Sequence, residues 1–299
     1  MQKDPATPAP ASPYDIVKHV MRDRMGSLTL AERQVANALF QDYPVAGLQS
    51  ITELAKSAQV STPTVVRLAR KLGYDGFTGL QEALRREISE QIKKPISKLA
   101  GADAGTSDSH SLFRFAETAV ANMHNTLARL ETGSFDTVAA LLADPDRPVF
   151  VEGGRITRSN ADYLFNHLQI IRPHVTSLGR APSVWPQYLL DMDDRSVLIL
   201  FDIRRYESDL LKLARLGKER GCTLILFTDQ WNSPIAAIAD HVFSVMVEAP
   251  SSWDSTIALM LVLETMIAEV QIRLKDLSRD RIETLEGMFT ETRLFRDFN

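Results

Sequence analysis

The chain has 299 residues, of which 44% are hydrophobic and 24% charged, with a net charge of −4. This length and composition suit an ordinary globular protein of two domains. No stretch approaches the roughly 20 apolar residues that span a bilayer, the N-terminus lacks the apolar core of a signal peptide, and the single cysteine, Cys222, excludes an internal disulfide framework. We therefore expect a cytoplasmic protein without membrane contact.

Charge is distributed unevenly along the chain. Residues 14–94 hold twelve Lys and Arg against nine Asp and Glu, a net charge of +3. Residues 95–299 hold twenty-one Lys and Arg against twenty-eight Asp and Glu, a net charge of −7. A basic segment favours a polyanionic partner, although a solvated cationic face would give the same small excess.

The first part of the chain is predicted to be helical. Residues 1–13 are rich in Pro and Ala, which predicts a disordered tail. Apolar spacing then predicts five helices. They are expected at 14–25, at 30–43, between Ser50 and the turn 58–60, between Ser61 and Gly73, and from Thr78 to about Lys94.

Helix starts in this region have capping-box spacing, in which the first residue and the residue three further on satisfy each other's backbone N–H groups. The pairs are Thr29 with Glu32, Ser50 with Glu53, and Thr78 with Gln81. We expect the second helix to bury the apolar residues Leu30, Val35, Leu39 and Phe40.

A different pattern follows a small, polar linker at 95–111. Helices are expected at 112–131 and 134–143, and then strands alternate with helices. The strands are predicted at 149–152, 175–178, 197–201, 223–227 and 242–247, and the helices at 159–169, 206–220 and 234–239. This alternation predicts a doubly wound parallel α/β sheet at 112–299. A last apolar helix, 254–274, either crosses the core or packs on another subunit.

The helices on either side of the turn 58–60 have the layout of a helix-turn-helix, whose second helix enters the DNA major groove. Val65, Leu68, Ala69 and Leu72 give that helix an inward stripe, and the polar residues are expected outside. The candidate DNA-binding residues are Ser61, Thr62, Thr64, Arg67, Arg70 and Lys71. Threonine and arginine suit base edges, and Arg70 and Lys71 suit phosphates.

The segments from Leu28 to Arg33, from Ser50 to Ala55 and from Val60 to Phe77 carry a specific pattern, Val-Ser-x-x-Thr-Val-x-Arg followed by Lys-Leu-Gly-Tyr-Asp-Gly-Phe. It resembles the RpiR/MurR family of bacterial transcriptional regulators, over essentially the whole chain after residue 14. The resemblance implies a helix-turn-helix DNA-binding domain at 14–94 and a sugar-isomerase-type (SIS) domain at 112–299 that senses phosphosugars and forms oligomers.

Two turns at the carboxyl ends of strands are candidate ligand-binding segments, because open parallel sheets bind ligands there. The first supplies Gly153, Gly154, Arg155 and Thr157. Its glycines would let backbone N–H groups approach an anion, although a plain tight turn has the same sequence. This turn resembles the one that has Gly-x-Gly-x-Ser in SIS domains. In this sequence Gly153 and Thr157 fit that pattern, and Arg155 stands at the position of the second glycine.

The second turn departs further from the family. The SIS pattern Ser-x-Ser-Gly-x-Thr, a hydroxyl-rich phosphate cradle, falls without gaps on Asp202, Arg204, Arg205 and Glu207. We predict that Arg204 and Arg205 form a different anion clamp, with Asp202 holding one arginine or accepting from a sugar hydroxyl. The alternative is that both arginines form ion pairs within the protein.

These patterns predict a DNA-binding regulator modulated by a carbohydrate-derived ligand, phosphorylated or acidic, rather than an enzyme. The alternative is an SIS-fold sugar-phosphate isomerase with an accessory N-terminal domain. The six histidines show no metal-ligand spacing, and no cofactor is expected. Because one recognition helix covers a half-site, we expect a homodimer or homotetramer.

Overall fold

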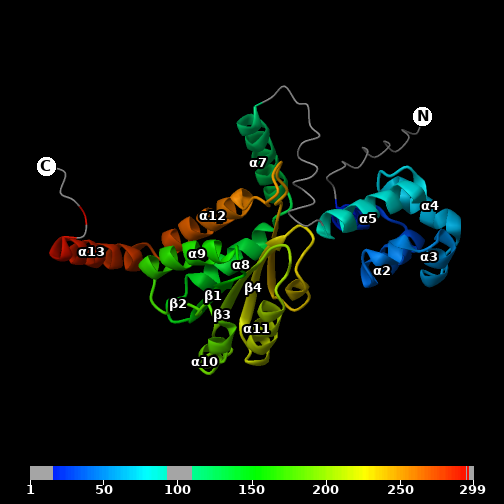
Figure 1. The fold of residues 1–299 in the computed structure, drawn as a ribbon. Coiled ribbons are helices and arrows are strands. Elements are labelled where there is room, and N and C mark those ends of the chain that lie inside the picture. Colours follow the sequence, from blue (N-terminus) through cyan, green and yellow to red (C-terminus); the bar gives the residue numbers. More distant parts are fainter. Residues whose placement is uncertain (1–15, 93–109, 294, 296–299) are drawn as a thin grey trace, which may run out of the picture. The chain divides into compact units, whose positions relative to one another are not determined.

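The computed structural model describes residues 16–92, 110–293 and 295. Contacts divide the chain into two compact units, one within residues 1–94 and the other within residues 95–299 (Figure 1). The predicted tail, 1–13, lies outside the described residues, as does the predicted linker except for its last two positions. None of the helices in the described part of the chain has both the length and the apolar character needed to cross a membrane.

The N-terminal unit is all-helical, as predicted. Its α-helices are α1 (Val17–Arg24), α2 (Leu30–Gln41), α3 (Ile51–Ser57), α4 (Thr62–Lys71) and α5 (Gly76–Ile92). Two 3₁₀ turns, η1 (Met25–Ser27) and η2 (Val45–Leu48), connect the first three helices. The capping boxes that begin α2 and α3 are both formed, which fixes where each helix starts.

One core holds these helices together. Its fully buried members include Met21 of α1, Leu54 of α3, Leu68 of α4, and Leu72, which directly follows α4. Helix α4 ends at Lys71, and Gly73, two residues further on, has a φ of +87°, in the left-handed region that favours glycine. The apolar stripe predicted for α4 is therefore the face that anchors it in the unit.

A buried carboxylate joins the two ends of this unit. Glu87 on α5 accepts hydrogen bonds from the Val17 backbone N–H and the Tyr43 hydroxyl, and Glu87 is only 9% exposed. Burial raises its pKa to about 7, more than the two hydrogen bonds and the charge of Lys18 lower it.

Two details of the helical prediction are wrong. Leu30 is 79% exposed, because it is the first residue of α2 and projects from the end of the helix, whereas Val35 and Leu39 lie deeper. The third capping box is absent, because α5 begins at Gly76 rather than Thr78. Gln81 instead donates from its side chain to the Gln49 carbonyl (2.7 Å).

The second unit contains a parallel sheet of five described strands, as predicted. They are β1 (Val149–Gly153), β2 (Val175–Ser177), β3 (Val197–Asp202), β4 (Thr223–Asp229) and β5 (His241–Val245). Their spatial order is β2-β1-β3-β4-β5. From β1 the next strand, β2, is added on one side of the sheet, and from β3 the strands β4 and β5 are added on the other side. The boundary between β1 and β3 is therefore the topological switch point of a doubly wound sheet.

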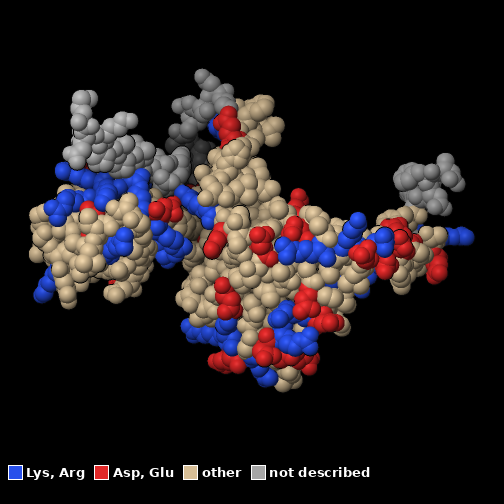
Figure 2. Space-filling model, turned by 180° about the vertical axis from the view of Figure 1, so that it is seen from behind, with Lys and Arg blue, Asp and Glu red and all other residues tan. Residues whose placement is uncertain are grey.

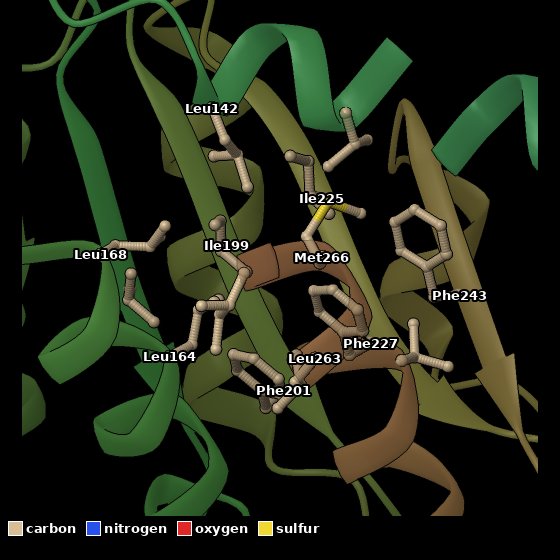
Figure 3. Close-up of a cluster of buried hydrophobic side chains, with 14 of the residues drawn as sticks. Leu142, Leu164, Leu168, Ile199, Phe201, Ile225, Phe227, Phe243, Leu263 and Met266 are labelled. Carbon is tan, nitrogen blue, oxygen red and sulfur yellow. The ribbon is translucent and has the colours of Figure 1, made fainter. Parts of the chain in front are cut away.

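Helices cover both faces of this sheet (Figure 1). One face packs against α8 (Thr132–Leu142), α9 (Arg158–Ile171) and α12 (Ile257–Arg273), and the other against α10 (Trp185–Leu189) and α11 (Ser208–Glu219). Figure 3 shows the first core, in which the rings of Phe201, Phe227 and Phe243 from three adjacent strands stack with centroids 4.8 and 4.9 Å apart. Helix α7 (Ser111–Leu127) packs on α12 and β5.

The long apolar helix lies in the core of its own unit. Seven of the residues of α12 are buried, and they belong to the core shown in Figure 3. Of the two alternatives for the segment 254–274, the structure supports the core position. Two helices were not predicted, α10 and α13 (Lys275–Thr292). Helix α10 has five residues, and α13 has a single buried residue, Ser278, so neither has a clear apolar stripe.

Candidate functional site

The two halves of the helix-turn-helix, α3 and α4, meet across a tight turn. Gln59 has a φ of +54°, and the Val60 N–H donates to the Ala55 carbonyl at 2.9 Å, which closes the end of α3. Ser61 is the N-cap residue of α4, as predicted, but its side chain does not bond a backbone N–H of the helix. The Ser61 hydroxyl instead meets the Thr64 hydroxyl at 3.1 Å.

Thr64 does not face outward, which corrects the sequence prediction. It is 4% exposed, because its position on α4 lies at the edge of the stripe that packs into the core. Its hydroxyl accepts a hydrogen bond from Nη2 of Arg67 at 3.0 Å. Thr64 therefore orients the exposed Arg67 rather than presenting itself to a base.

Lys71 is also placed differently from the prediction. Its Nζ donates to the Ser27 carbonyl at 2.8 Å and to Oε2 of Glu32 at 3.0 Å. Glu32 is buried, and its other bonds close the capping box of α2. The geometry makes Lys71 a tie between α4 and α2, with its charge already paired.

Arg67 and Arg70 of α4 are exposed, and Thr62 is half-buried at the first position of the helix. Figure 2 shows Lys and Arg side chains close together on the visible side of this unit, with few Asp and Glu between them. Among the described residues of this unit, the exposed cations are Arg22, Arg33, Lys56, Arg67, Arg70, Arg85 and Arg86. Exposed cations of this kind are suited to a polyanion.

In the second unit, the predicted ligand-binding turns follow β1 and β3 at the switch point. The strands are in register up to Gly153 opposite Phe201, so the two turns leave the sheet side by side. The Gly154 N–H donates to the Phe201 carbonyl at 3.0 Å, and the Thr157 hydroxyl donates to the same carbonyl at 2.7 Å. Thr157 is 4% exposed, and its hydroxyl serves this link between the turns.

The glycines of the first turn lie in close contacts, with backbone at Gly153 and with a side chain at Gly154. A Cβ on Gly153 would lie 2.7 Å from the Thr157 carbonyl oxygen, and one on Gly154 would lie 2.9 Å from Oε1 of Glu207. The backbone N–H of Arg155 donates to that same Oε1 at 2.6 Å. The Arg155 side chain is exposed.

Arg204 does not form the predicted anion clamp. Its Nε lies 2.8 Å from Asp254, its Nη2 lies 3.9 Å from Glu248, and its guanidinium stacks 4.1 Å from the ring centroid of Trp231. The side chain is 7% exposed. The alternative of an ion pair within the protein is therefore correct for Arg204, because two carboxylates after β5 already hold it, while Arg205 is exposed.

Asp202 is held by hydroxyl and backbone groups, not by an arginine. The Ser233 hydroxyl donates to its Oδ2 at 2.5 Å, and the Glu207 N–H donates to its Oδ1 at 3.3 Å. Asp202 is 2% exposed. Burial raises its pKa to about 6, and the nearby charges of Asp229 and Glu207 add to that effect.

Sequence reasoning missed Asp229, which organises the second turn. Its carboxylate accepts from the Arg204 N–H and the Tyr206 hydroxyl, both at 2.8 Å. Arg204 and Arg205 have φ values of +35° and +54°, a left-handed conformation that costs non-glycine residues about 1 kcal/mol each. Asp229 stabilises this turn. Its position at the carboxyl end of a predicted strand is the sequence feature from which its role could have been predicted.

The described residues contain no group of three or more His, Cys, Asp or Glu side chains arranged to hold a metal ion. The polar groups at the carboxyl edge of the sheet are instead bonded to one another. They form an edge of backbone N–H groups, hydroxyls and carboxylates that hold the two turns together.

An exposed, cationic helix-turn-helix joined to a doubly wound parallel unit defines a class of protein, the two-domain DNA-binding regulators. Comparisons with known proteins agree. The rpiR family helix-turn-helix domain matches residues 17–91, and the SIS domain matches residues 141–269. The chain therefore belongs to the RpiR family of helix-turn-helix transcriptional regulators with an SIS domain.

Individual relatives span most of the chain. A helix-turn-helix transcriptional regulator of Haemophilus influenzae is 26% identical over 217 residues, which cover 72% of this chain and 75% of the relative. The sugar isomerase domain of an RpiR transcription factor from Sphaerobacter thermophilus has a TM-score of 0.55 at 20% identity, covering 58% of this chain and 97% of that one. The Vibrio vulnificus NanR protein, solved with ManNAc-6P, has a TM-score of 0.54 at 16% identity, and the match covers 94% of this chain and 100% of that one. At these identities the two structures establish the fold.

Proposed function

We propose that this regulator binds operator DNA through α4 and that a small carbohydrate-derived effector bound by the SIS unit controls that binding, without catalysis. The observation that carries the proposal is the pair of exposed arginines, Arg67 and Arg70, on the second helix of a capped helix-turn-helix. Ser61 and Thr62, at the start of the same helix, are the further DNA contacts we propose.

DNA binding is tested with a duplex selected from a random pool by repeated rounds of binding. Arg67→Ala should weaken binding to the selected duplex by about 1–3 kcal/mol if Arg67 contacts a base. Wild-type affinity should fall steeply as salt rises, because phosphate contacts release counterions. Equal affinity of the wild type and Arg67→Ala would remove Arg67 from the interface.

For the effector, we propose a site at the β1–β3 switch point, formed by Gly153, Gly154, Arg155 and Thr157 with Asp202 and Arg205. The topology of the sheet supports this position, and the relative solved with ManNAc-6P supports a carbohydrate-derived ligand. Because hydroxyl and N–H groups of the chain already bond the carboxylates of Asp202 and Asp229, a binding role is favoured over acid–base catalysis.

A thermal-shift screen of sugars, sugar acids, polyols and sugar phosphates tests the effector proposal. A true effector raises the melting temperature in proportion to occupancy and changes the affinity for the selected duplex. A compound that is chemically converted by the protein would instead support the isomerase alternative.

We also propose that the protein is a homodimer whose contact includes α7. Phe113, Val120 and Leu127 are spaced by seven residues and therefore share one face of this helix. They are 61%, 47% and 51% exposed, whereas α12, for which the sequence left a subunit contact as one of two alternatives, is buried in its own unit. Light scattering should give a dimer for the wild type and a smaller species for Val120→Glu; a monomeric wild type would refute this part of the proposal.

A further inference from the structure

The turn after β1 already holds an anion, and that anion belongs to the chain itself. Oε1 of Glu207 accepts a hydrogen bond from the Arg155 N–H at 2.6 Å. The turn leads directly into α9, a helix of 14 residues whose N-terminus carries partial positive charge. A carboxylate therefore lies where an anionic group of a ligand would be stabilised.

The fit of this carboxylate depends on a glycine. A Cβ at position 154 would come within 2.9 Å of Oε1 of Glu207 and 3.3 Å of its carboxyl carbon, so a side chain there would displace the carboxylate. Glu207 is itself held, because it is the N-cap residue of α11 and its N–H donates to Asp202. The contact thus joins the two turns at the switch point through positions fixed on both sides.

Two buried carboxylates near the turn disfavour a second anion beside them. Asp202 and Asp229 are 2% and 0% exposed, and both lie beside this turn pair. The guanidinium of Arg204 is paired with Asp254 and Glu248. A phosphate group, with nearly two negative charges, would have to displace Glu207 and then lie close to buried carboxylates.

We infer that Glu207 is a specificity-determining residue of the effector site, whose carboxylate takes the place of a ligand phosphate at the turn 153–157, so that the site accepts uncharged carbohydrate-derived molecules and rejects phosphorylated ones. This inference rests on the proposed effector function of the SIS unit. It narrows the class of effector to molecules that bind by hydroxyl groups alone.

The test uses the full chain with inorganic phosphate as the probe, at constant ionic strength. Because phosphate also binds basic surfaces, the readout is the NMR signal of the Arg155 backbone amide. Glu207→Ser frees the turn while keeping a good N-cap residue for α11. Glu207→Gln removes the charge but still fills the space, and Glu219→Ser removes the same charge from the exposed far end of the same helix.

We expect a saturable phosphate-dependent shift of the Arg155 amide in Glu207→Ser, with an affinity at least tenfold higher than in the wild type, Glu207→Gln and Glu219→Ser. Saturable binding of phosphate at Arg155 in the wild type, as tight as in Glu207→Ser, would overturn the inference. So would a Glu207→Ser protein that binds no more tightly than Glu219→Ser. Both outcomes are measured without DNA and therefore test only the role of Glu207. The proposed function fails separately, if no effector changes the affinity of the protein for the selected duplex.

Discussion

Lys71 and Arg70 are neighbours on the recognition helix, and the structure assigns them different tasks. Lys71 bonds Ser27 and Glu32 within the unit, whereas Arg70 is exposed. We therefore predict that Lys71→Met lowers the stability of the N-terminal unit and leaves DNA binding nearly unchanged. Arg70→Met should have the opposite effects.

The magnitude for Lys71 follows from the burial of its partner. Exposed ion pairs contribute about 0.2–1 kcal/mol, and breaking a fully buried pair costs about 3–5 kcal/mol. The Lys71 and Glu32 side chains are 35% and 8% exposed, and Glu32 keeps its bond from the Thr29 N–H when Lys71 is lost. An intermediate loss of about 1–2 kcal/mol in the free energy of unfolding is expected for Lys71→Met.

For Arg70, the expected change is in the salt dependence of binding. Losing one phosphate contact should reduce the slope of log K against log salt by about 0.9, while stability stays within about 0.5 kcal/mol of the wild type. The slope is measured by fluorescence anisotropy with the selected duplex over a series of salt concentrations. Lys71→Met should leave it unchanged.

Stability of the two units can be followed separately in the intact protein. All three tryptophans lie in the second unit, at 185, 231 and 253, so tryptophan fluorescence reports that unit alone. The transition in circular dichroism that leaves tryptophan fluorescence unchanged belongs to the N-terminal unit. A Lys71→Met variant with wild-type stability and a reduced salt slope would refute the assignment of Lys71 as an internal tie.

Three further predictions test the remaining contacts. Thr64→Val should weaken DNA binding by about 0.5–1.5 kcal/mol through loss of the hydroxyl that orients Arg67, and this loss should vanish in an Arg67→Ala background; additive losses would contradict an orienting role. The pKa of Glu87 is raised to about 7 in the fold, so the contribution of Glu87 to the stability of the N-terminal unit should be greatest below about pH 4.5 and fall by about 3 kcal/mol as pH rises to 7. Glu87→Gln should remove that contribution to the pH dependence, and an unchanged pH profile would refute it. Phe227→Ala, which removes the middle ring of the stack in Figure 3, should destabilise the second unit by about 3–5 kcal/mol in tryptophan-monitored unfolding, and a loss below about 1 kcal/mol would contradict the packing described.

The elements that were predicted correctly have their determinants close together in the sequence. The capping boxes at Thr29 and Ser50 each depend on two residues three positions apart, and the strands β1, β3 and β4 are short apolar runs buried along nearly their whole length. Such patterns fix local structure and, through the alternation of strands and helices, the parallel sheet.

The sites were harder to predict because their side chains are paired across long stretches of chain. Residue types suggested that Arg204 would clamp a ligand, but Asp254 holds it fifty positions later. Lys71 looked like a phosphate contact until Glu32, thirty-nine positions earlier, was placed beside it. In both cases the sequence identifies a cation correctly, and only the fold determines whether its charge is already compensated.

The same reasoning explains why the loss of hydroxyl groups around Asp202 does not by itself mean the loss of a ligand site. The backbone of the second turn is left-handed at Arg205, and the turn after β1 has two glycines and an N–H group that donates to an anion, the carboxylate of Glu207. A carboxylate supplied by the chain satisfies the electrostatic demand of that turn without a ligand. If the proposed role of Glu207 holds, a change at this one position would alter which molecules the site accepts and leave the architecture around it intact.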